Sequence, residues 1–242
     1  MEEPRLRTAD KVPPPYPLGK FSQATIYDIA AEIVFLLHTR GEARLEGSDW
    51  ERIFALGIGA DWQPSNIGLD DVRLGNCCWG AKTVKSANPA KATKLRLISG
   101  RNSLDYSYKQ SDSRGLSPDA IGERVLGIWN QRVSSVRQRF AHCRTAVLIK
   151  SNDLSQCALF EFETLRFEAE RFAWAWNKDG NLVGADENGR HKFTWQPHGS
   201  QFTIVEEVPQ NRVAFNLRLP ERLSVDFALK ALGFDNSWVQ II

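Results

Sequence analysis

The chain has 242 residues, of which 42% are hydrophobic and 25% are charged, and its formal net charge at pH 7 is +2. These proportions are typical of a globular protein with a sizeable core, and they exclude a wholly disordered chain. No apolar run approaches the ~20 residues that a membrane-spanning helix needs, so we expect no membrane partner.

The N-terminal part of the chain begins with a proline-rich segment, residues 1–20, which we expect to form an extended arm. This segment lacks the apolar stretch of a secretory signal, and the four cysteines have no metal-type spacing, so we expect a cytoplasmic protein with reduced thiols. Apolar residues at helical spacing predict a helix over residues 22–40. Ser48 and Glu51 form a capping-box pattern that predicts a short helix over residues 48–56.

A β-hairpin is predicted around Gly75-Asn76, a pair that allows the positive φ angles of a tight turn. With this pair at the turn, the register places Asp71 opposite Gly80. Side chains alternate between the two faces of a strand, so Lys82 shares a face with Gly80, and Asp71 joins it there. A carboxylate and an ammonium group should therefore project together, whereas Asp70 should point to the other face.

The middle of the chain predicts a third strand, a long helix and two more strands. Residues 94–99 alternate like a strand, and Arg101 and Asn102 follow it. These two side chains either contact DNA bases and phosphates or belong to a plain turn. Ser117-Pro118 begins the longest helix, whose apolar stripe continues to residue 140. The two further strands cover residues 145–150 and 157–163.

The last third of the chain is rich in β-structure. Two hairpins are predicted, over residues 172–183 and 191–205, followed by a strand over 212–219 and a short helix that begins at Ser224. Polar side chains gather at the second hairpin, where they either read base edges in a major groove or form an ordinary hydrophilic loop. The polar residues around this tip, which Trp195 flanks, are His191, Lys192, Gln196, His198, Ser200 and Gln201.

Positive charge is concentrated in one segment of the chain. From Lys82 to Lys150 there are fourteen Lys and Arg residues against four acids, a balance of +10 that leaves −8 for the remainder. A basic segment of this kind suits a phosphate-binding cleft, because neutralised phosphates release counterions and add affinity. The alternative is a solvated face whose acidic partners come from elsewhere in the fold.

The hairpin that carries Asp71 and Lys82 resembles the motif of the PD-(D/E)-x-K nuclease superfamily, which includes most Type II restriction endonucleases. By motif position, Asp71 matches the family's Asp and Lys82 matches its Lys. Leu69-Asp70 stands where Pro-Asp is usual, and Gly80 stands where the second acid is expected. The resemblance implies an α/β (α+β) fold with a mixed central sheet flanked by helices, to which the C-terminal β-hairpins are added.

The resemblance also implies a function, a Mg²⁺-dependent, sequence-specific endonuclease that hydrolyses double-stranded DNA. Asp71 and Lys82 are then catalytic, and Asp71 holds the metal with help from Asp70, Glu32 or Glu123, unless the last two are ordinary surface acids. The expected catalytic set is Asp71, Lys82 and Glu123, and the expected metal ligands are Asp71, Asp70 and Glu32. Expected DNA contacts are Lys85, Arg96, Arg101, Asn102, His191, Lys192, Trp195, Gln196, His198 and Gln201.

The expected organisation is an N-terminal arm (1–20), a nuclease-like core (21–164) and a β-rich DNA-recognition part (165–242) packed on the core as one domain. The main alternative function is a catalytically inactive DNA-binding protein that keeps the nuclease-like fold, and Gly80 favours this reading. The sequence leaves open whether the chain works alone or as a homodimer.

Overall fold

The structure, a computed structural model, describes residues 12–109, 115–218 and 221–242, and within them the chain forms five α-helices and two β-sheets. The fold is therefore mixed α and β, as the sequence predicts. Residues 1–11, the larger part of the expected N-terminal arm, lie outside the described residues. Within the described part, every helix is too short or too polar to cross a membrane.

The first sheet has six strands and mixed direction. Its order is β1 (Asp61–Trp62), β2 (Val72–Leu74), β3 (Cys77–Lys85), β5 (His142–Lys150), β6 (Gln156–Glu163) and β11 (Val213–Asn216). Strands β3 and β5 run parallel, and the other neighbouring pairs are antiparallel. A parallel pair needs a crossover connection, and here that connection contains β4, α3 (Leu104–Tyr108) and α4 (Pro118–Arg137).

The second sheet has five antiparallel strands. Its order is β4 (Lys94–Arg101), β10 (Gln201–Glu207), β9 (His191–Gln196), β8 (Leu182–Asp186) and β7 (Phe172–Trp176). The two predicted C-terminal hairpins are confirmed as β7–β8 and β9–β10. The predicted third strand, β4, extends to Arg101 and pairs with β10 rather than with the first sheet.

Side chains cap the helices where the sequence predicts. Ser22 accepts a hydrogen bond at the start of α1 (Gln23–Arg40), and Gly41 ends this helix with a positive φ of 72°. Ser117 begins α4 in the same way, with Pro118 in the first turn. The last helix, α5 (Val225–Leu232), begins at Ser224 and ends at Gly233.

Helix α2 (Gly47–Gly57) begins earlier than the sequence predicts. Glu46 and Asp49 form its capping box, in place of the expected Ser48 and Glu51. Glu51 therefore lies inside the helix, where its side chain is available for other contacts.

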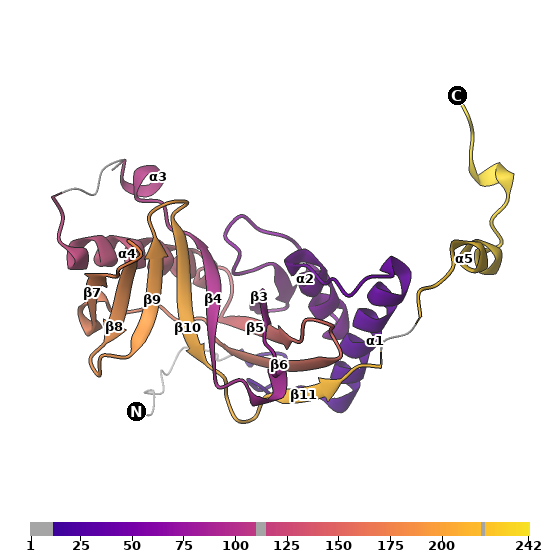
Figure 1. Cartoon of the computed structure of the whole chain (residues 1–242), viewed down its shortest axis with the longest axis horizontal. Helices are drawn as coiled ribbons and strands as arrows, with labels where there is room; N and C mark the ends of the chain where they lie inside the picture. The colour runs from indigo at the N-terminus through magenta and orange to yellow at the C-terminus, as the bar shows by residue number, and fades with distance from the viewer. Residues whose placement is uncertain (1–11, 110–114, 219–220) are drawn as a thin grey trace.

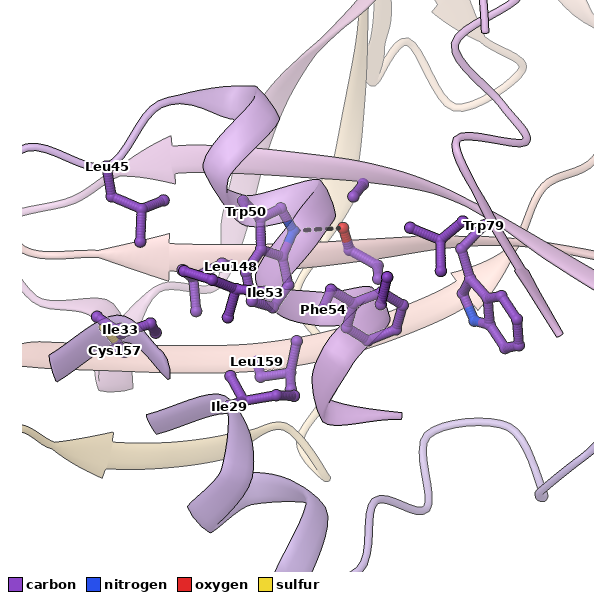
Figure 2. Packing of buried hydrophobic residues seen from close by; sticks show 14 of the residues in the cluster. Ile29, Ile33, Leu45, Trp50, Ile53, Phe54, Trp79, Leu148, Cys157 and Leu159 are labelled. Carbon is purple, nitrogen blue, oxygen red and sulfur yellow. Dashed lines mark hydrogen bonds between the residues drawn. The ribbon is translucent and has the colours of Figure 1, made fainter. Parts of the chain in front are cut away.

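The hydrophobic core lies on both faces of the first sheet. Helices α1 and α2 cover one face (Figure 1), where Trp50 and Phe54 of α2 pack toward Trp79 of β3. Figure 2 shows this packing, in which the Trp50 indole donates a hydrogen bond to the Ala146 carbonyl at 3.4 Å. The opposite face packs against α4 and the second sheet. The four cysteines are buried without a disulfide, as expected for reduced thiols.

The two sheets exchange strands across the predicted boundary near residue 164. Strand β4 precedes that boundary but belongs to the second sheet, and β11 follows it but belongs to the first. Helix α4 packs between the sheets, since its Val125 and Trp129 share a core cluster with Cys78 of the first sheet and Phe202 of the second. The core and the β-rich part therefore form one interleaved unit.

Candidate active site

The β2–β3 hairpin has the register that the sequence predicts. Leu74 pairs with Cys77 across the turn, and Val72 pairs with Trp79. Gly75 in the turn has a positive φ of 57°. Continuing this register by one residue places Asp71, just before β2, opposite Gly80 of β3. Asp71 and Lys82 then act on each other electrostatically, as the hairpin argument requires.

Asp71 has one carboxylate oxygen without a protein partner. Its Oδ1 accepts a hydrogen bond from the Ser65 backbone N–H at 2.9 Å, whereas its buried Oδ2 accepts none from the described residues. Burial raises the pKa of the Asp71 carboxyl above its usual value, and this effect outweighs the Ser65 hydrogen bond and the positive charge of Lys82. A buried carboxylate oxygen with no partner is costly unless a ligand binds it.

Lys82 points into the protein rather than into solvent. Its Nζ lies 3.4 Å from the Gly68 carbonyl oxygen, to which it donates a long hydrogen bond. Burial lowers the pKa of the Lys82 ammonium group, while the negative charges of Asp71 and Glu51 oppose this change. Such an ammonium group is poised to exchange a proton or to hold an anionic oxygen.

Glu51 of α2 is the acid that the sequence argument missed. Its charge acts on Lys82, the charge of Asp71 acts on it, and its carboxylate accepts a hydrogen bond from the Trp62 indole at 3.3 Å. Burial, followed by the charge of Asp71, raises the pKa of the Glu51 carboxyl. The Ser48-x-x-Glu51 pattern assigned this residue to a helix cap, and only the true start of α2 shows that it is not one.

Gly80 leaves little room for the acid that the nuclease motif usually places there. A Cβ atom at Gly80 would lie 3.0 Å from the Gly68 carbonyl oxygen and 3.2 Å from the Leu69 Cα, both parts of the backbone. A side chain there would require the backbone of the loop before β2 to shift by a few tenths of an ångström. The carboxylate beside Asp71 whose charge acts on Lys82 belongs to α2 rather than to β3.

The other acids proposed from the sequence lie in different environments. Glu32 is part of α1 and Glu123 is exposed on α4, and neither charge is among those that act on Asp71 or Lys82. Asp70 is fully buried, and its carboxylate is held by Arg73 at 2.8 Å and Arg139 at 3.0 Å. The Ser65 hydroxyl also donates a hydrogen bond to it at 2.6 Å. We therefore assign Asp70 to the structural framework of the loop rather than to the site.

Arg132 of α4 is a second cation near the site. Its guanidinium donates hydrogen bonds to the Ser99 carbonyl oxygen at 2.6 Å and to the Ile67 carbonyl oxygen. Burial lowers the pKa of Arg132, and the charge of Asp71 opposes this change. The side chain ties the loop before β2 to the second sheet. Helical periodicity alone did not indicate that Arg132 would reach this loop.

The residues expected to contact DNA fall into an exposed and an interior group. Lys85, Arg96 and Arg101 are exposed, and so is His198 in the turn between β9 and β10, with Gln196 and Gln201 half-buried beside it. Asn102 and Trp195 are buried, contrary to the expected DNA contact. The Trp195 indole donates to the Asn102 carbonyl at 2.9 Å, and the Asn102 amide donates to the Val125 carbonyl at 2.8 Å.

Two further members of that set are held by neighbouring residues. The Lys192 ammonium group lies 2.9 Å from a Glu206 carboxylate oxygen, and both side chains line a recess of about 290 Å³ that Lys82 also lines. His191 makes hydrogen-bond contacts with the Thr194 hydroxyl and the Phe193 carbonyl. His191 and Lys192 therefore lie at the start of β9 rather than at the tip of the hairpin, where we expected them.

The site thus consists of two carboxylates and a lysine, Asp71, Glu51 and Lys82, with Arg132 beside them. In the described ranges, no three His, Cys, Asp or Glu side chains gather into a ready-made metal-ligand set. Comparison with protein-family models, with curated proteins and with solved structures finds no match for this chain.

Proposed function

We propose that this protein is a Mg²⁺-dependent endonuclease of the restriction type, which hydrolyses phosphodiester bonds of double-stranded DNA at specific sequences. The observation that carries this proposal is that the charges of Asp71 and Glu51 both act on the buried Lys82 ammonium group, while the buried Asp71 Oδ2 has no hydrogen-bond partner among the described residues. The hairpin resemblance to the PD-(D/E)-x-K nucleases supports the same reading.

The residues of the site fit a hard divalent cation. Mg²⁺ prefers oxygen ligands and is commonly held by one or two carboxylates together with water and substrate phosphate oxygens. Asp71 and Glu51 would hold it, because burial raises the pKa of both carboxyls, the charge of Asp71 raises that of Glu51 further, and a bound cation would favour the ionised forms. A bound Mg²⁺ would lower the pKa of a coordinated water and stabilise the charge that develops on the phosphate.

Lys82 supplies the remaining charge for hydrolysis. Its ammonium group, buried among the site's carboxylates, would orient the attacking water or hold a non-bridging phosphate oxygen. Its hydrogen bond to the Gly68 carbonyl oxygen, in the loop that covers Gly80, holds it in place before DNA binds. Because the backbone already positions Lys82, less conformational entropy is lost when the transition state forms.

Exposed cations would bind the DNA backbone around the site. Lys85 follows Lys82 at the end of β3, and Arg96 and Arg101 are exposed on β4. Phosphate contacts of this kind give affinity without sequence information, so sequence would be read by other groups. The turn between β9 and β10 offers exposed His198 and half-buried Gln196 for that task.

The second candidate is a DNA-binding protein that has the same fold but does not cleave. One observation favours it, namely that the described residues gather two carboxylates at this position rather than a complete three-ligand set.

Incubation of the protein with unmethylated DNA of varied sequence, with and without Mg²⁺, separates the two candidates. The endonuclease should yield discrete fragments only with Mg²⁺. Specific binding that leaves the DNA intact under both conditions would favour the inactive protein.

A further inference from the structure

The last 22 residues form a C-terminal arm (residues 221–242) that stands away from the body of the protein. Figure 1 shows this arm, with α5, extending beyond α1 to the C-terminus. A backbone hydrogen bond of 2.9 Å from Leu223 N to the His38 carbonyl oxygen attaches it near the end of α1. Beyond that point, no residue of the arm is buried.

The C-terminal arm is nevertheless strongly apolar. Phe234 and Trp238 pack against each other, with ring centroids 5.6 Å apart, and both remain exposed. Large exposed apolar groups of this kind mark interaction surfaces, because a monomer gains nothing by holding them in water. The exposed large apolar residues of the arm are Val225, Phe227, Leu232, Phe234, Trp238, Val239, Ile241 and Ile242.

A second uncovered apolar surface lies on α1, close to the point where the arm leaves the body. Tyr27 is 66% exposed and Phe35 is 63% exposed, and with Ala31 they form the α1 stripe (Tyr27, Ala31 and Phe35). Residues four apart share one face of a helix, so the stripe is continuous. The buried face of α1 is a different one, formed by Ile29, Ile33 and Leu37.

The acids beside the α1 stripe can pair with one cation of the arm, which itself also carries three acids (Glu221, Asp226 and Asp235). Asp28 and Glu32 border the α1 stripe, and α1 has no basic residue before its last turn. Lys230 of the arm lies three residues after Phe227, on the same side of α5 as this ring. A cation on the arm therefore matches the acids beside the stripe.

We propose that the C-terminal arm covers the α1 stripe of a second copy of this chain, so that two copies exchange arms and form a symmetric dimer. In a two-fold symmetric dimer the same contact between arm and stripe forms twice, and the two contacts together cover the apolar surfaces of both copies. Each contact joins three rings of the arm to two of the stripe, and these rings are 39–66% exposed. Covering them buries about 90–150 Å² each, or roughly 900–1,500 Å² over the two contacts, which is close to the ~1,200 Å² of a stable interface. This dimer does not depend on the nuclease proposal.

The mass of the protein in solution, measured by light scattering during gel filtration, tests the exchange. The full chain should have twice the mass of one copy. A chain that ends at Leu223, and a full chain with Phe35→Glu, should each have the mass of one copy. Tyr106→Glu is the matched control, because Tyr106 is an exposed aromatic (91%) on α3, outside both surfaces, and this variant should remain a dimer.

Mixing the two monomeric variants distinguishes exchange from an arm that folds back on its own α1. The chain that ends at Leu223 keeps the stripe, and the Phe35→Glu chain keeps the arm, so together they should form a one-armed heterodimer. Three outcomes overturn the exchange: a full chain that is monomeric, a dimer that survives loss of the arm, or a Phe35→Glu chain that remains a dimer.

Discussion

Gly80 lies where the backbone leaves little room for a side chain. A Cβ atom there would be in tight contact with Gly68 and Leu69, and in the proposed site the second carboxylate is that of Glu51 from α2. The gap in the nuclease motif is thus explained by the course of one loop. It does not by itself indicate that the site has decayed.

Gly80→Asp should therefore harm the protein instead of completing the motif. We expect the unfolding free energy to fall by about 1–3 kcal/mol, because the new side chain must displace the Gly68-Leu69 backbone. Urea unfolding measures this change. Gly47→Ala is the control, since a Cβ at Gly47 meets no atom within 4 Å. Undiminished stability together with stronger Mg²⁺ binding in Gly80→Asp would show that the loop is free to move.

Mg²⁺ should stabilise the fold more as the pH rises. The pKa values of the Asp71 and Glu51 carboxyls are raised by folding, so their ionisation weakens the metal-free fold as pH rises from their usual values through the raised ones. Mg²⁺ requires the ionised forms, so its effect grows over the same window. At a Mg²⁺ concentration a hundredfold above its Kd, binding should raise the free energy of unfolding by about 2.7 kcal/mol.

Thermal unfolding with and without Mg²⁺ across a pH series checks this expectation. The increase in Tm caused by Mg²⁺ should be small at low pH and grow as the pH rises. In Asp71→Asn this increase should be small at every pH. An increase that is independent of pH, or that persists in Asp71→Asn, would place the metal elsewhere.

At the scale of elements, Asp70 fastens the loop before β2 to the end of α4. Its fully buried carboxylate binds Arg73 beside it in sequence and Arg139 just after α4. Asp70→Asn should lower the unfolding free energy by about 1.5–3 kcal/mol, because hydrogen bonds to a charged group are lost. Mg²⁺ titration should show nearly normal affinity. Loss of Mg²⁺ binding at unchanged stability would instead make Asp70 a metal ligand.

The β9–β10 turn and β4 should contribute differently to DNA binding. Arg101→Ala should weaken binding to every sequence and reduce the log–log salt slope by about one unit, as expected for a phosphate contact. His198→Ala and Gln196→Ala should cost about 1–3 kcal/mol on the preferred sequence and much less on others. Titration of a preferred and a scrambled duplex at several salt concentrations measures both. Equal losses of affinity for the two duplexes would show that the turn does not contribute to sequence recognition.

The elements themselves were largely predictable because their signals are local. Ser22, Gly41 and Ser117 mark helix ends by capping chemistry, and Gly75 marks a turn by its φ angle. Sheet membership was not predictable, since β4 pairs with β10 about a hundred residues later, and alternation in β4 does not specify its partner. The start of α2 was misplaced because two capping patterns overlap there, and that error hid Glu51.

At the scale of the whole molecule, site residues that are close in sequence could be paired from the sequence alone, whereas those brought together by folding could not. Asp71 and Lys82 could be paired from the sequence because one short turn joins their strands. Glu51 and Arg132 come from helices that approach the hairpin only in the folded chain. Asn102 and Trp195 look suited to DNA contact, but packing of α4 between the sheets buries both.

The central claim is that Asp71, Glu51 and Lys82 form a Mg²⁺-dependent cleavage site, and comparison of glutamate variants in a DNA cleavage assay tests it most directly. Glu51→Gln should lower the cleavage rate at least about a hundredfold. Glu32→Gln and Glu123→Gln, matched changes on α1 and α4, should cut within about twofold of the original chain, since neither charge acts on Asp71 or Lys82. Normal cleavage by Glu51→Gln, with loss in either of the other two, would contradict the site.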